Sequence, residues 1–312
     1  MKINVNDIEG LPVANLGMEY WNDILRNVKH NANQLINNKL SDRYLKYPIE
    51  IDFYLYQNIK NDPNAYAEKI FDRKYNIYIG RKLLILINNH SYEIIDKKLV
   101  FKDIKRSEEN REILLNLASA IFYYWMDFIC LHEWFHITRG HLEYYNKPHY
   151  EFNILSEQNE EDLFFEMDAD RYAMKLVTKR FAATIKNLKT IIDIEDRVLI
   201  ENFIMAMTYL FHIFFLLNGE NKRGCHPSAL ERINTILPAI AESMHNQNTF
   251  KISEHELGEL LLKKIEQFTL ENGMEYNINS KKYEADTVSL FDNYFAFLRE
   301  KKIEEYQILK SL

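Results

Sequence analysis

The chain has 312 residues, a formal net charge of −7 at pH 7, 47% hydrophobic and 27% charged residues, and two cysteines. This length and composition predict a folded protein with a substantial core, and a negative charge without a basic stripe argues against a nucleic-acid partner. Cys130 and Cys225 are too few for a disulfide framework and favour a reducing, cytoplasmic location.

Membrane segments are not expected. The first residues, Met1 to Asp7, contain no apolar secretion segment. The longest apolar run, Phe203 to Leu217, contains His212 and is shorter than the roughly 20 residues needed to span a bilayer. We interpret this run as a core helix.

The first third of the chain predicts one helix followed by strands. Residues 1–17 are expected to be irregular, and residues 20–40 have helical spacing of apolar side chains. Residues 49–59 alternate well enough for a strand, and Asp62-Pro63-Asn64 marks a turn.

Three further apolar segments predict short antiparallel strands directly before the next helix: Asn76–Ile79, Leu83–Ile87 and Tyr92–Ile95. A small sheet of this kind has an edge strand that can pair with an extended peptide, although the sequence does not identify which strand lies at the edge.

A long buried helix follows this sheet. Ser107 can cap it, with Glu108 and Glu109 in its first turn, where the helix dipole favours carboxylates. From Ile113 to Ile129 the apolar residues run almost all the way round, which is typical of a buried helix. This helix leads directly into the most informative motif of the chain.

The motif is His132-Glu133-Trp134-Phe135-His136. Histidines four residues apart share one face of a helix and can bind one metal ion. Glu133 projects beside the open side of that metal, where a general base must lie. The alternative is a coincidental pattern on a core helix, so a third ligand is needed to support the metal site. Trp134 and Phe135 fit core packing.

An acidic segment downstream, Glu160 to Ala173, supplies that third ligand. Glu166 and Asp170 are four residues apart and share a helix face. Glu166 can bind the metal, while Asp170 accepts a hydrogen bond from the far nitrogen of a ligand histidine. The alternative is a solvated acidic helix face, but the histidine pair upstream favours the metal site. Imidazole and carboxylate ligation with an open position makes Zn²⁺ the expected ion.

These motifs resemble the gluzincin metallopeptidases. The pattern is similar to that of the CAAX-processing and heat-shock peptidases, whose His-Pro and Arg-Ile elements resemble His226-Pro227 and Arg232-Ile233. It is also similar to the phage-exclusion peptidases typified by Lit, which are His-Glu-x-x-His proteins that cleave a translation factor. The resemblance spans roughly residues 75–235.

The resemblance implies a zincin-like fold and hydrolysis of a peptide bond, with Glu133 as the base. It suggests His226 as the donor that stabilises the oxyanion, with Arg232 as its orienting partner. The alternative for His226 is a helix cap or a loop histidine, and both interpretations stay open. His141 is expected to lie on the wrong face of a continuing helix and to be structural.

The remaining segments predict helices. A loop joins the two ligand helices, and helices are expected over residues 160–180, 193–217, from His226 onward, 253–268 and 285–309. The predicted class is therefore α+β and mainly helical, in a single domain over residues 1–312. Its expected parts are an N-terminal helix and sheet (1–100), a metallopeptidase core (101–240) and a helical C-terminal layer (241–312).

Three functional hypotheses follow. The leading one is a zinc-dependent endopeptidase that cleaves a cytoplasmic protein in phage defence or stress, controlled by an activating or inhibiting protein partner because an unregulated cytoplasmic protease is toxic. The second is a catalytically silent zinc-binding regulatory or interaction protein. Glu133 argues against it, since a structural zinc site needs no base and usually has four protein ligands. The third is a membrane-associated processing enzyme.

Overall fold

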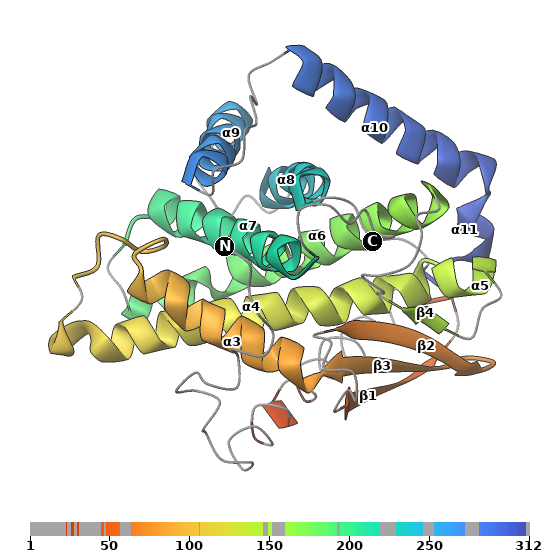
Figure 1. Cartoon of the computed structure of the whole chain (residues 1–312), viewed down its shortest axis with the longest axis horizontal. Helices are drawn as coiled ribbons and strands as arrows, with labels where there is room; N and C mark the ends of the chain where they lie inside the picture. The colour runs from red at the N-terminus through yellow and green to blue at the C-terminus, as the bar shows by residue number, and fades with distance from the viewer. Residues whose placement is uncertain are drawn as a thin grey trace.

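The computed structural model is mainly helical with one small sheet, so the predicted α+β class is confirmed (Figure 1). The described residues are 45–46, 48–56, 64–105, 107–145, 149–151, 160–191, 194–218, 229–245, 253–271 and 281–309, with isolated helical positions at 23, 26, 27 and 30. The predictions for residues 1–17, for most of the helix over residues 20–40 and for His226 lie outside them.

The sheet has four strands in the order β1-β3-β2-β4. Their bounds are β1 (Glu50–Tyr56), β2 (Ala65–Phe71), β3 (Lys74–Gly80) and β4 (His149–Glu151). The sheet is mixed, because β1 runs parallel to β3 whereas the other two pairs are antiparallel. The prediction of an antiparallel sheet is therefore wrong for β1. Within the described residues, β1 and β4 are the two edge strands.

The two strands predicted at residues 83–87 and 92–95 are wrong. A single helix, α3 (Arg81–Asp96), replaces them. Its buried positions include Leu83, Ile87 and Ile94, which recur at helical spacing. A short apolar run fits either a buried strand or a buried helix, and the polar residues between the two runs are part of the helix, not a turn.

The site is built from a second group of helices. A short 3₁₀ turn, η4 (Glu108–Asn110), leads into α4 (Arg111–Thr138), whose C-terminal half is buried on every side. Ser107 precedes η4, but its side chain makes no capping hydrogen bond. α6 (Glu160–Ile191) packs along α4, and α5 (His141–Tyr145) follows α4 directly.

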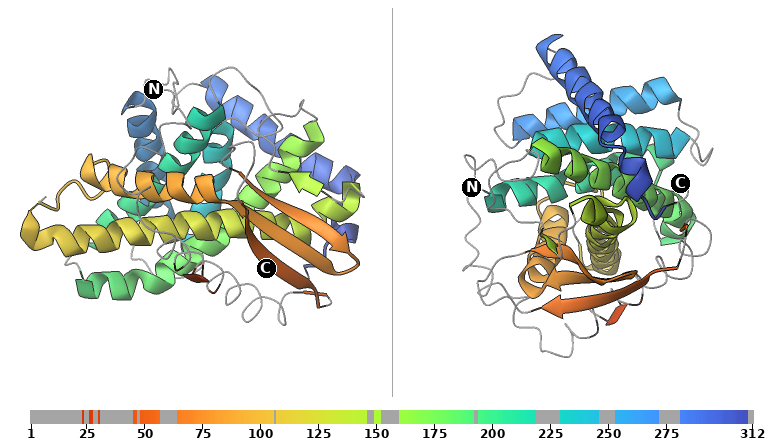
Figure 2. Two further views of the ribbon diagram at one scale, coloured as in Figure 1. Left: turned by 60° about the horizontal axis from the view of Figure 1, so that its bottom comes forward. Right: turned by 90° about the vertical axis from the view of Figure 1, so that its right-hand side faces the viewer.

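The helical predictions for the last third of the chain are confirmed with shifted ends. The helices are α7 (Asp196–Asn218), α8 (Ala229–His245), α9 (Glu254–Glu271), α10 (Lys281–Glu300) and α11 (Ile303–Tyr306). Figure 2 shows the sheet beneath α3 and α4, with α6 to α10 stacked on the other side of these helices. The ligand helices therefore lie in the middle of the molecule, between the sheet and the C-terminal layer.

Two helical stretches are long and apolar enough to cross a membrane by length and composition, residues 108–138 and 196–214. In the structure, the most apolar 18-residue segment of the first stretch is 56% buried, and that of the second is 72% buried. They are α4 and α7, which both pack against other helices.

Candidate metal centre

Three side chains that can bind a metal converge where α4 packs on α6. His132 and His136 come from α4 and Glu166 comes from α6, and all three are buried. The Nε2 atom of His132 lies 3.2 Å from Oε2 of Glu166, and Nε2 of His136 lies 3.2 Å from Oε1. The two Nε2 atoms are 3.0 Å apart. The structure therefore brings together the ligand set that the sequence indicated.

The spacing of these donor atoms fits a metal ion. Donor atoms that share a tetrahedral ion at about 2.0–2.1 Å lie roughly 3.3 Å from one another. The separation of 3.0 Å between the two Nε2 atoms comes close to that value, as do the two of 3.2 Å to Glu166, one to each of its carboxylate oxygens. Two imidazoles and one carboxylate also leave one tetrahedral position open, as catalytic zinc sites do.

Buried charge at the site also favours a cation. Four carboxylates and two guanidinium groups lie around the histidines, each less than a tenth exposed: Glu133, Glu166, Asp168, Asp170, Arg139 and Arg232. A buried charge without an opposite partner is costly, so a bound cation would stabilise this excess of carboxylates.

Glu133 is placed by the helix itself. It follows His132 within one turn of α4 and is 1% exposed. A carboxylate at this position projects beside the face that carries the two histidines. The sequence predicts that this carboxylate is the general base.

His132 is held by a carboxylate and an arginine. Its Nδ1 lies 2.9 Å from Oδ1 of Asp170, the residue that the sequence proposed for this contact. Arg232, from α8, donates two hydrogen bonds of 2.7 and 2.6 Å to the same carboxylate, and its guanidinium stacks over Phe211 and Phe214. The contact orients His132 so that Nε2 faces the metal site.

His136 is held by a second histidine. The Nδ1 atom of His141 lies 3.0 Å from Nδ1 of His136, and its Nε2 lies 3.1 Å from Oδ2 of Asp168. Arg139 donates two hydrogen bonds of 2.6 and 3.0 Å to Asp168, and the Tyr294 hydroxyl donates one of 2.5 Å. His141 thus contacts the ring of His136 directly, and Asp168, Arg139 and Tyr294 support it from behind.

The prediction that the site helix continues to His141 is wrong. α4 ends at Thr138, and Gly140 has a φ of +81°, a left-handed conformation that glycine adopts readily at the end of a helix. The chain turns there, which carries His141 back onto His136. A glycine directly after the motif was the signal for this turn.

Burial and neighbouring acids set the protonation of the two ligand histidines. Burial opposes the charge on His132, but Glu166 and Asp170 outweigh it and raise its pKa to about 10. Burial lowers the pKa of His136 to about 3, in spite of Glu166. Without a metal ion, the extra proton is therefore favoured on His132 over His136, and a metal ion bound to Nε2 of His132 would displace it.

The sequence missed Asp168 and Tyr294. Burial would raise the pKa of Asp168, but Arg139 and His141 hold it well below its usual range, so it is a buried carboxylate anion. Glu166, Asp168 and Asp170 alternate with apolar residues, and this pattern indicated that the segment is buried. A solvated acidic face would not be flanked by Phe165 and Ala169, which are fully buried. Nothing near Tyr294 in sequence points to the site.

Arg232 belongs to this centre, whereas two further histidines, His149 and His212, contact other parts of the chain. Arg232 binds Asp170, and its proposed partner His226 is outside the described residues. His149 is in β4, in register with Glu68. His212 packs against Tyr209 and Phe268.

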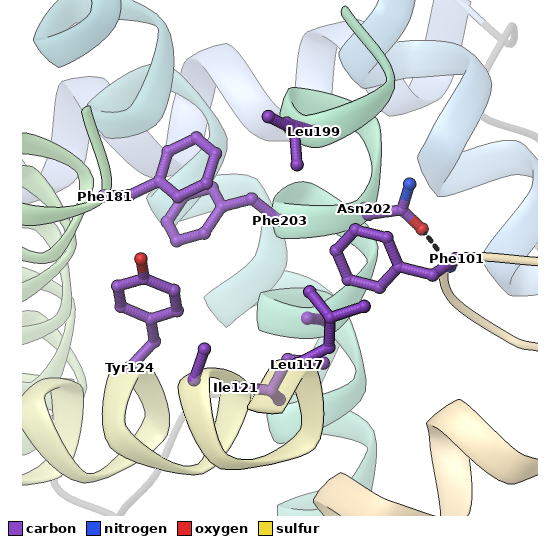
Figure 3. A pocket seen from close by; sticks show the side chains of 10 residues that line it. Phe101, Leu117, Ile121, Tyr124, Phe181, Leu199, Asn202 and Phe203 are labelled. Carbon is purple, nitrogen blue, oxygen red and sulfur yellow. Dashed lines mark hydrogen bonds between the residues drawn. The ribbon is translucent and has the colours of Figure 1, made fainter. Parts of the chain in front are cut away.

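A small apolar hollow is separate from this centre (Figure 3). It measures about 330 Å³ including the part open to solvent. Its lining residues come from α4, α6, α7 and the loop before η4: Phe101, Leu117, Ala120, Ile121, Tyr124, Phe181, Leu199, Asn202, Phe203 and Ala206. Tyr124 precedes His132 by eight residues, or about 12 Å along the helix, so the hollow does not open onto the metal site.

Comparison with known proteins gives one match. The family model described as Peptidase U49 matches residues 63–251, which is more than half of the chain and includes both ligand helices. No curated protein matches the chain, and no solved structure matches it. The match agrees with the resemblance of the sequence to Lit-type peptidases. The chain is therefore a member of the peptidase U49 family.

Proposed function

We propose that this chain is a zinc-dependent endopeptidase that hydrolyses peptide bonds of a protein substrate. The observation that carries the proposal is the convergence of His132, His136 and Glu166 on one point, with Glu133 buried next to His132 in α4, in a member of a peptidase family. Zinc, when bound, supplies a Lewis acid that polarises the scissile carbonyl and makes a water molecule acidic.

The protein's own residues supply the proton chemistry. Glu133 takes a proton from the attacking water and delivers it to the leaving amine. Asp170 and His141 keep the two ligand rings oriented, so that the metal-facing nitrogens carry no proton. His226 is our proposal for the group that stabilises the oxyanion, on the sequence resemblance alone.

The biological setting is a further part of the proposal. The likeness to Lit-type peptidases supports a cytoplasmic role in phage defence or stress, with a protein partner that controls activity. An extended substrate would pair with an edge of the sheet, for which the described strands offer β1 and β4.

The test separates metal binding from catalysis. Zinc content of the purified protein should be about one ion per chain in the wild type and in Glu133→Gln, and should be lost in Glu166→Ala. Glu133→Gln should lower peptide-bond hydrolysis by about 10²–10⁴-fold, because it removes the base and keeps the ligands. Glu112→Gln, on the exposed first turn of the same helix, is the matched control.

The substrate is sought without assuming its identity. New protein N-termini are labelled and counted by mass spectrometry in cells that express the wild type or Glu133→Gln, with and without phage infection. N-termini that depend on Glu133 support the peptidase. A wild type that binds no zinc after zinc is added contradicts the proposal. Zinc binding without any Glu133-dependent cleavage would favour the silent zinc-binding protein.

A further inference from the structure

The C-terminal end of the described chain reaches back to the metal centre. We use the name C-terminal strap for residues 294–309, which comprise the second part of α10, α11 and the segment after it. Figures 1 and 2 show α10 running along the outside of the helical layer and descending at its C-terminal end to α11, beside α5. The strap lies outside residues 63–251, the part of the chain that the family model matches.

The strap makes a polar contact with the support of His136. Tyr294 is 1% exposed, and its hydroxyl donates a 2.5 Å hydrogen bond to Oδ1 of Asp168. The other oxygen of that carboxylate accepts from His141, and His141 contacts His136. Tyr294 is therefore three hydrogen bonds away from the metal-facing ring.

The strap also packs around the turn that carries His141. The ring of Phe297 lies 5.3 Å from that of Phe165, which in turn lies 4.4 Å from the ring of His141. The backbone nitrogens of Ile308 and Leu309 donate hydrogen bonds of 2.9 and 3.1 Å to the carbonyl of Thr138. These contacts close the end of α4 from outside.

Gly140 shows how close the strap lies to this turn. A Cβ atom on Gly140 would lie 2.4 Å from the carbonyl oxygen of Tyr306. Only a glycine lets the two backbones approach in this way. The turn and the strap therefore fit each other in one arrangement.

The hydrogen-bond directions along this path follow from the tautomer of His136. If His136 presents the lone pair of Nε2 to the metal, its Nδ1 carries the proton and donates to Nδ1 of His141. His141 is then neutral, carries its proton on Nε2 and donates to the carboxylate of Asp168. Because this carboxylate also accepts from Tyr294, the strap is hydrogen-bonded to the same path.

We propose that the C-terminal strap is a positioning element of the metal centre, with Tyr294 as its positioning residue, so that the second histidine ligand is held in place only while α10 is docked. The proposal rests on the proposed function, because it assigns the strap to the same site. Tyr294, Phe295 and Phe297 of the strap all contact α6, so a change in the strap affects the docking of α10. Release of the strap weakens metal binding without touching a ligand.

The test uses the full chain with Tyr294→Phe, which removes the hydroxyl and keeps the ring. Tyr124→Phe is the matched control, because it removes a half-buried hydroxyl in the middle of α4, eight residues before His132, that contacts Thr184 of α6. Zinc affinity is measured by competition with a chelator. Loss of an outer partner of a ligand typically costs 10–100-fold, and we expect the low end, about 10-fold, for Tyr294→Phe and no change for Tyr124→Phe.

Two other measurements report on the arrangement itself. In protein labelled with ¹⁵N-histidine, the ring N–H signals of His136 and His141 should shift or broaden in Tyr294→Phe, while that of His132 stays unchanged. Amide hydrogen exchange across residues 138–145 should become faster. Phe297→Leu, which keeps the hydroxyl and loosens the docking, should produce the same changes to a smaller extent.

The outcomes separate this proposal from the proposed function. Zinc affinity within twofold of the wild type, together with unchanged signals of His136 and His141 in Tyr294→Phe, overturns the role of the strap. A wild type that binds no zinc overturns the proposed function, and hydrogen exchange of residues 138–145 in Tyr294→Phe then still decides whether the strap holds the turn.

Discussion

The two histidines that we propose as metal ligands lie one helical turn apart, yet the structure supports them differently. His132 contacts a carboxylate directly, and Asp170 and Arg232 complete its support within the segment that the family model matches. His136 contacts a neutral imidazole, and its support runs through Asp168 to the C-terminal strap outside that segment.

This difference has a chemical consequence. A carboxylate that accepts the Nδ1 proton makes an imidazole more basic and a stronger metal ligand than a neutral acceptor does. His132 therefore has the stronger, fixed support, and His136 has the weaker one. The support of His136 ends on Tyr294 in α10. A change in the position of α10 can therefore alter how His136 is held, whereas the described support of His132 comes from α6 and α8.

The largest effects are expected when each aspartate becomes asparagine. Asp170→Asn leaves Arg232 buried without its counter-charge, so we expect a loss of about 3–5 kcal/mol in the free energy of unfolding. Zinc affinity should fall about 10–100-fold, because the contact to His132 is direct. Urea unfolding and chelator competition measure the two quantities.

Asp168→Asn tests the support of His136 in the same way as Asp170→Asn tests that of His132. It disturbs three donors, from Arg139, His141 and Tyr294, so its loss of stability should equal or exceed that of Asp170→Asn. Its zinc affinity should fall less, because the histidine ligand is one residue further away. A larger loss of zinc affinity in Asp168→Asn would show that our ranking of the two supports is wrong.

A smaller effect is expected from Gly140→Ala, which pushes the strap away from the turn. The positive φ and the 2.4 Å contact with the Tyr306 carbonyl oxygen should lower the free energy of unfolding by about 1–3 kcal/mol. Gly258→Ala is the control, since a Cβ there meets nothing within 4 Å, and in α9 it should stabilise by about 0.5–1 kcal/mol. Equal melting temperatures for the two variants would contradict the close fit of the strap.

The smallest effects are expected from exchanging each arginine for lysine. Lysine keeps the charge but cannot form the two-pronged contact, so Arg232→Lys and Arg139→Lys should each cost about 1–2 kcal/mol. The ring N–H signal of His132 should move only in the first variant and that of His141 only in the second. Movement of both signals in either variant would mean that the two supports form one coupled network.

The sequence by itself determined the local part of the site. Histidines at a spacing of four share a helix face whatever the rest of the fold does, and the same periodicity pairs Glu166 with Asp170. An all-round apolar stretch before the motif was enough to predict a buried helix, which α4 is over its C-terminal half. Periodicity distinguishes a helix from a strand poorly in short apolar runs such as Leu83–Ile87 and Tyr92–Ile95. For this reason α3 was predicted as strands.

The tertiary structure alone decided the support of His136. Tyr294 and Asp168 are 126 residues apart, and no periodicity relates positions on separate helices. His141 reaches His136 only because the chain reverses at Gly140, and Arg232 reaches Asp170 only because α8 packs on α6. Side-chain spacing within a helix is fixed by backbone geometry, whereas contacts between helices depend on how the whole core packs.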